Sequence, residues 1–117
     1  MSLKEFEKLV HDALENLPEF FKEKLENVDV VVQDWPSPRY SRGRLLLGLY
    51  QGVPKTRRGT GYTFVLPDKI TIFQGPIELL ARDNAEMIKN LVTDTVQHEI
   101  AHYFGISDTR LRQLKKK

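Results

Sequence analysis

The spacing of apolar residues near the start of the chain predicts helical structure. Apolar side chains recur at intervals of three and four residues from Phe6 to Leu17, which is the spacing of one helix face. Ser2 and Glu5 stand just before this run in the order of a capping box, which starts a helix. Pro18 ends the run and suits the first turn of a second, shorter helix over residues 19–25.

Four short apolar segments predict strands. Val28–Gln33 is rich in β-branched residues, which favour a pleated strand. Three further runs, at residues 45–50, 62–66 and 69–73, are separated by stretches that contain glycine or proline. Residues 69–73 are expected to be the last strand before the chain returns to helical periodicity.

The C-terminal part of the chain has helical spacing again. Gly75 and Pro76 start a predicted helix that reaches about Arg82, and Asp83 is the expected N-cap of a long helix over residues 84–104. A short last helix contains Leu111 and Leu114. Together these elements predict an α+β fold, a small mixed sheet of three to four strands flanked by helices.

Length and composition limit the class of protein. A chain of 117 residues with 40% apolar content suits one small domain, here residues 1–117. No apolar run approaches 18 residues and no signal peptide opens the chain, so we expect a cytoplasmic protein without a membrane partner. The chain has no cysteine, which excludes disulfides, a thiolate zinc site and a cysteine nucleophile.

The charge balance gives little support to a nucleic-acid partner. Eighteen basic and sixteen acidic side chains leave a net charge of only +2. The basic residues gather at 39–44, 55–58 and 115–117, and we interpret these clusters as solvated loops and a frayed end. The sequence leaves the oligomeric state open.

His98-Glu99-Ile100-Ala101-His102 is the segment with the clearest chemical meaning. Residues four apart on an α-helix lie about 400° apart in rotation, so the two histidines share one face and can bind one metal ion. Glu99 lies beside them, where it could hold a metal-bound water and take its proton. The segment therefore predicts a zinc site with a general base on the long helix.

A third ligand is needed, because catalytic zinc usually has three protein ligands. Gly105 can adopt the left-handed conformation that ends a helix, and Asp108 follows three residues later. This order matches the extended zinc motif H-E-x-x-H-x-x-G-x-x-H/D. Asp108, or Ser107 beside it, could instead be the N-cap of the last helix, and one residue could do both. Asp94 could orient a ligand histidine or be a surface carboxylate.

The chain resembles the minimal zincin-like metallopeptidase family, small bacterial proteins of one domain. Residues 46–54, 66–78 and 95–108 carry the resemblance. It implies zinc held by His98, His102 and Asp108, Glu99 as the catalytic carboxylate, and a peptide or protein as substrate. Two features depart from the larger metzincins, which have histidine in place of Asp108 and a methionine turn below the metal.

The hypothesis of peptide hydrolysis adds two expectations. An extended substrate is expected to lie along an edge strand, for which residues 69–73 are the first choice. The group that stabilises the oxyanion is left open among Tyr50, Tyr62, Tyr103 and the basic residues 39–44, although the helical pattern places Tyr103 in the core.

Two other functions stay open. Endoribonucleases that mature bacterial ribosomal RNA also have two histidines four residues apart and a third ligand after a glycine, but they lack a glutamate after the first histidine. Glu99 therefore favours the peptidase. The third possibility is a zinc protein without catalysis, in which the metal stabilises the C-terminal turn or binds the peptide of a partner.

Overall fold

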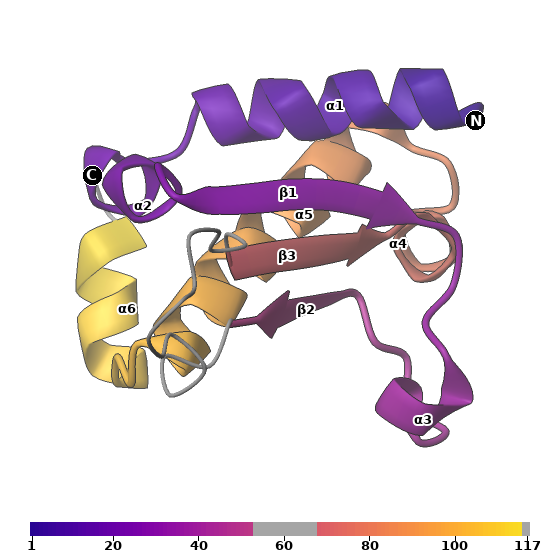
Figure 1. Ribbon diagram of the computed structural model, residues 1–117. Coiled ribbons are helices and arrows are strands. Elements are labelled where there is room, and N and C mark those ends of the chain that lie inside the picture. Colours follow the sequence, from indigo (N-terminus) through magenta and orange to yellow (C-terminus); the bar gives the residue numbers. More distant parts are fainter. Residues whose placement is uncertain (53–67, 116–117) are drawn as a thin grey trace, which may run out of the picture.

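The computed structural model describes residues 1–52 and 68–115, and its centre is a mixed sheet of three strands (Figure 1). The strands are β1 (Val28–Gln33), β2 (Gly48–Gln51) and β3 (Asp68–Phe73), in the order β1-β3-β2. β3 runs parallel to β1 and antiparallel to β2. The predicted α+β class with a small mixed sheet is confirmed. The strand predicted over residues 62–66 lies outside the described residues.

β3 is the central strand, so the expectation that residues 69–73 form an edge strand is wrong. Both sides of β3 are paired, and four consecutive residues, from Ile70 to Phe73, are buried. Such an unbroken buried run is expected of an inner strand of a sheet and not of an edge strand. Among the described strands the edges are β1 and β2, and β2 is also shorter than the predicted strand over residues 45–50.

Helices cover one face of this sheet and its ends (Figure 1). The described part of the chain contains α1 (Leu3–Glu15), α2 (Glu19–Lys24), α3 (Pro38–Ser41), α4 (Gln74–Ala81), α5 (Ala85–Tyr103) and α6 (Asp108–Lys115). The capping box predicted for the first helix is confirmed, since Ser2 and Glu5 satisfy each other's backbone N–H groups.

The N-cap of α5 is one residue later than predicted. The side chain of Asn84 accepts a hydrogen bond from the backbone N–H of Met87 at 3.0 Å. Asp83, the predicted cap, has a φ of +61° and belongs to the turn that reverses the chain after α4. Two adjacent polar residues were both acceptable caps, and the turn after α4 decides between them.

α5 is the main element of the core. Its buried side chains Ile88, Val92, Val96 and Ile100 lie against the sheet and against α1, whose own core residues include Phe6 and Val10. A regular spacing of four residues places all four on one face, so the opposite face of α5 reaches the surface. In the described residues, no helix is both long and apolar enough to cross a membrane.

Candidate metal centre

The two histidines of the motif lie in the last turns of α5, on its exposed side. His98 and His102 are both exposed, while Ile100 and Ala101 between them are buried. The packing of this buried face sets the rotation of α5 about its axis. Both imidazoles therefore project from the opposite, exposed side of the helix. The predicted placement of the motif on the long helix agrees with this structure.

His98 is oriented by its own helix. Its Nδ1 lies 2.8 Å from the backbone carbonyl oxygen of Asp94, which leaves Nε2 as the nitrogen that can face an ion. The carboxylate of Asp94 instead forms an ion pair with Lys115 of α6, Oδ1 to Nζ at 3.3 Å. The idea that the Asp94 carboxylate orients His98 is therefore wrong in this structure, because the backbone carbonyl of residue 94 makes the contact and the carboxylate belongs to a surface ion pair.

Glu99 connects α5 to the edge strand β2. Its Oε1 accepts a hydrogen bond from the backbone N–H of Tyr50 at 2.9 Å. The half-buried position raises the pKa of Glu99, while this hydrogen bond and the neighbouring His102 and His98 lower it, so that the net direction is upward. The two residues are 49 positions apart, and nothing in the local sequence predicts their contact.

The backbone of β2 explains why that N–H is available. Phe73 of β3 donates a backbone hydrogen bond to the carbonyl of Leu47. In an antiparallel pair, alternate residues turn their backbone groups toward and away from the partner strand. The N–H groups of Gly48 and Tyr50 therefore point away from β3, toward the open side of the sheet where Glu99 lies.

The glycine predicted to end the helix does so. Gly105 has a φ of +67°, in the left-handed region. Its N–H bonds to the carbonyl of His102, and the N–H of Ile106 bonds to the carbonyl of Ala101 at 2.8 Å. This double contact is the Schellman motif, and it sets the direction in which the chain leaves the two histidines.

Ser107, not Asp108, caps the last helix. The hydroxyl of Ser107 accepts a hydrogen bond from the backbone N–H of Arg110 at 3.2 Å, and its carbonyl accepts from Leu111. Asp108 is the first residue of α6 and is exposed. Of the two candidate N-caps, Ser107 is therefore the cap of α6, and the Asp108 carboxylate is not.

The donor set fits zinc in its chemistry, since two imidazoles and a carboxylate are ordinary zinc ligands. Across residues 1–52 and 68–115, no three His, Asp or Glu side chains lie close enough together to hold a metal ion. His98, His102 and Asp108 as joint ligands, with Glu99 beside them, therefore stay a prediction.

An aromatic cluster lies beside the motif. The ring of Tyr103 stacks on the ring of Tyr50, with centroids 4.0 Å apart, and Phe104 meets both edge-on. Tyr103 is 44% exposed, so its predicted place in the core is wrong. The helical pattern was misleading because the apolar partner of this ring is an edge strand at the surface.

Tyr50, one of the tyrosine candidates for oxyanion stabilisation, already uses its hydroxyl in another contact. The hydroxyl of Tyr50 donates to Oδ2 of Asp68 at 3.1 Å, and burial together with this bond raises its pKa. Tyr62 lies outside the described residues. Tyr50 therefore makes two hydrogen bonds, one from its hydroxyl to Asp68 and one from its backbone N–H to Glu99.

An apolar cleft of about 340 Å³ adjoins His98 and Glu99. It is bounded by the segment that leads into β2 and by the middle of α5, and its lining residues are Leu46, Leu47, Gly48, Leu91, Asp94, Thr95, His98 and Glu99. No pattern in the sequence predicted this cleft, because its leucines resembled the interior of a strand. The cleft can hold an apolar side chain next to the two functional groups.

Gly48 is expected to be necessary for the close contact of β2 with α5. A Cβ atom there would lie 2.5 Å from Cγ2 of Thr95 and 3.2 Å from the carbonyl oxygen of Thr71. We expect Gly48→Ala to lower the free energy of unfolding by about 1–3 kcal/mol, as overpacking does, and to shift the amide resonance of Tyr50. Urea unfolding and NMR spectra measure both effects.

The matched test removes the clashing methyl group. Thr95→Ser deletes Cγ2 and keeps the hydroxyl, so the double variant with Gly48→Ala should regain part of the lost stability and the original Tyr50 resonance. If Thr95→Ser gives no rescue, the contact between residues 48 and 95 is not what limits the approach of β2 to α5.

Comparison with known proteins gives one result that agrees with this geometry. The model of the zincin-like metallopeptidase family matches residues 25–117, which include β1, β2, β3 and the whole of α5. No curated protein sequence matches the chain. The family match covers more than half of the chain and includes the histidine pair, Glu99 and Asp108. The chain belongs to the zincin-like metallopeptidase family.

Proposed function

We propose that this protein is a zinc-dependent peptidase in which His98, His102 and Asp108 hold the ion and Glu99 is the general base. The observation that carries the proposal is the hydrogen bond from Tyr50 N–H to Glu99, which holds the motif's carboxylate against an edge strand. A carboxylate placed beside two histidines and an open strand lies where a peptide carbonyl would be presented. Membership of the family supports the same reaction class.

The chemistry is divided between the ion and the chain. A zinc ion at this site would act as a Lewis acid and lower the pKa of a bound water toward about 7. Oε1 of Glu99 accepts the hydrogen bond from the backbone N–H of Tyr50. With respect to the residues that the structure describes, Oε2 is then the oxygen able to take a proton. The same oxygen then returns that proton to the leaving amine.

The edge strand β2 offers a path for the substrate. Gly48 turns its backbone groups toward the open side of the sheet, where an extended peptide can pair with them. The cleft bounded by Leu46, Leu47 and Leu91 would then receive an apolar side chain of that peptide. β2 thus replaces β3 as the proposed substrate strand.

The test is a parallel digestion by zinc-loaded protein purified without an affinity metal. A mixed peptide library and a structured RNA are incubated separately, with and without a chelator. We expect new peptide termini that require zinc, enriched in one apolar residue beside the cut, and intact RNA. Cleaved RNA with intact peptides would assign the nuclease alternative, and two intact substrates would assign the non-catalytic one.

A further inference from the structure

The sheet has a second edge, far from the motif. β1 pairs only with β3, so in the described part of the chain the backbone groups along its outer side have no strand partner. Val30, Val31 and Val32 follow one another in this strand and are each half-buried. An edge strand rich in β-branched residues readily accepts a further strand.

A groove follows this edge. The face of α1 that carries Phe6 and Val10 packs on α5, and α1 runs alongside β1 (Figure 1). A hollow between the two elements is lined by side chains of both. The hollow has a volume of about 410 Å³ and is lined by His11, Leu14, Glu15, Lys22, Leu25, Glu26, Val28 and Val30. A second hollow of about 360 Å³ continues it along Glu7, Val10, His11, Leu14, Val30, Val31 and Val32.

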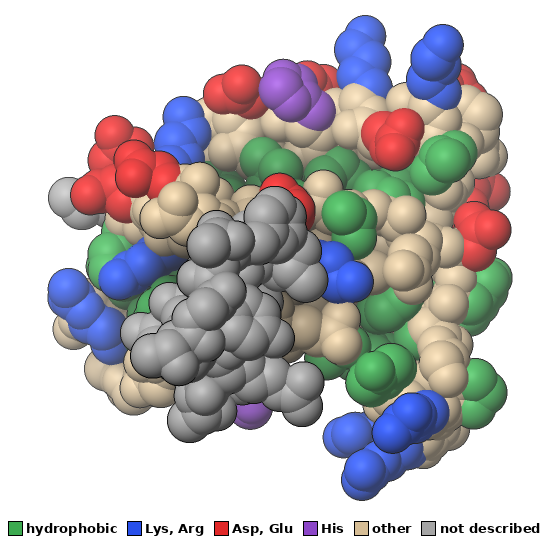
Figure 2. Space-filling model, in the orientation of Figure 1, with side chains coloured by type: hydrophobic (Ala, Val, Ile, Leu, Met, Phe, Trp, Pro, Cys, Tyr) green, Lys and Arg blue, Asp and Glu red, His purple; other side chains and the backbone are tan. Residues whose placement is uncertain are grey.

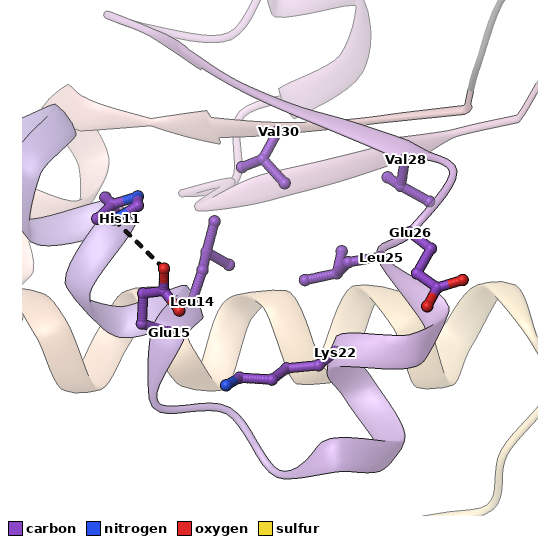
Figure 3. A pocket seen from close by; sticks show the side chains of 8 residues that line it. All are labelled: His11, Leu14, Glu15, Lys22, Leu25, Glu26, Val28 and Val30. Atoms are coloured by element: carbon purple, nitrogen blue, oxygen red, sulfur yellow. Dashed lines mark ion pairs between the residues drawn. The ribbon is translucent and has the colours of Figure 1, made fainter.

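The groove has an apolar floor and a charged rim. In Figure 3, Leu14 and Leu25 point into the space below Val28 and Val30, and the charged side chains lie around it. His11 Nε2 lies 3.5 Å from Glu15 Oε1 at one end of the rim. Figure 2 shows the same arrangement from outside, with apolar side chains in a band below the charged row of α1. The apolar floor can bury apolar side chains of a bound segment, and the charged rim can favour a segment of complementary charge.

The charge of this region is acidic although the chain is slightly basic. Residues 1–34 contain nine acidic and four basic side chains, a net −5, whereas residues 35–117 contain seven acidic and fourteen basic ones, a net +7. Three glutamates, Glu7, Glu15 and Glu26, are among the residues that line the two hollows, whereas Lys22 is the one lysine among them. Acidic side chains gather over α2 in Figure 2.

We propose that the groove between α1 and β1 binds an extended peptide segment in which apolar residues alternate with lysine or arginine. The segment adds to the outer edge of β1 as a strand, its apolar side chains enter the hollows, and its basic side chains meet the glutamates of the rim. A second copy of this chain fits less well, because it would bring an identical acidic rim against the first.

The inference does not rest on the peptidase function. β1 and β2 lie on opposite sides of β3, so the groove and the motif occupy different edges of the sheet. Binding at the groove can be measured without zinc and without turnover, and its result leaves the catalytic proposal untouched.

The probe is a blocked nine-residue peptide of alternating valine and lysine, compared with the peptide that has glutamate in place of lysine. We expect the lysine peptide to bind at least tenfold more tightly in calorimetry, with an affinity that falls as salt is added. Its amide shift changes in NMR spectra should be confined to α1, α2 and β1.

Two charge-reversed proteins separate the rim from net charge. Glu15→Lys combined with Glu26→Lys should lower the affinity for the lysine peptide at least tenfold. Glu19→Lys combined with Glu23→Lys makes the same change in charge at exposed sites of α2 that do not line the groove, and should keep the preference. Equal binding of both peptides, shifts outside the groove, or dimerisation that shifts the β1 amides without peptide would overturn the proposal.

Discussion

Glu99→Gln is expected to lower kcat for the peptide substrate by roughly 10²- to 10⁴-fold, the usual contribution of a general acid–base group. Glutamine keeps the shape of the side chain, and its carbonyl oxygen can still accept the hydrogen bond from Tyr50. The amide cannot take a proton from water. The variant should therefore keep the fold and the zinc content, measured by metal analysis, while initial rates fall.

The control is Glu86→Gln, at an exposed glutamate in the first turn of the same helix. It removes the same charge far from the motif and should leave kcat unchanged. An unchanged amide resonance of Tyr50 in Glu99→Gln shows that the contact with β2 has survived. Full turnover in that variant would exclude Glu99 as the base.

The local features of this fold could be predicted from the sequence because their causes are local. The run Val28–Gln33 forms β1 with the predicted bounds, and the capping box at Ser2 starts α1 as expected. Gly105 ends α5 because a left-handed residue is needed there. In each case the residues that decide the structure are neighbours in the sequence.

The features that the sequence missed depend on residues far apart. The central place of β3 results from pairing with two strands, β1 and β2, that both precede it in the sequence and lie on either side of it in the sheet. The residues Leu45 to Leu47 are as apolar as a strand, yet Leu46 and Leu47 form the wall of a cleft. Tyr103 follows the periodicity of a core residue, but its partner Tyr50 is on an edge strand.

The candidate site also has features that the sequence could predict and features that depend on contacts between distant residues. The spacing of the two histidines and Glu99 is a property of one helix, so the sequence could predict which residues share a face. The contact of Glu99 with β2 and the apolar cleft beside His98 arise only when α5 packs against the sheet. The motif thus indicated the class of chemistry that we propose, while its relation to the proposed substrate strand depends on the fold.

Zinc is expected to stabilise the protein, and His98→Ala is expected to abolish that effect. A ligand that binds only the folded state, at a free concentration of 100 times its Kd, adds about 2.7 kcal/mol to the free energy of unfolding. Thermal unfolding with and without zinc measures this gain, and metal analysis should give near one zinc per chain, lost in the variant. A His98→Ala protein that is stabilised as much as the original would place the metal elsewhere.

Asp108→Asn then decides whether the third ligand comes from α6. Ser107 performs the capping, so this change leaves the start of the helix intact while it removes the charge that would bind zinc. We expect the zinc-dependent gain in thermal stability to fall strongly, with the zinc-free midpoint unchanged. The matched control is Asp94→Asn, because the Asp94 carboxylate contacts Lys115 and only its carbonyl contacts His98. Equal zinc affinity in both variants would mean that Asp108 is not a zinc ligand. An ion held by His98 and His102 alone would then need its remaining ligands from water or substrate.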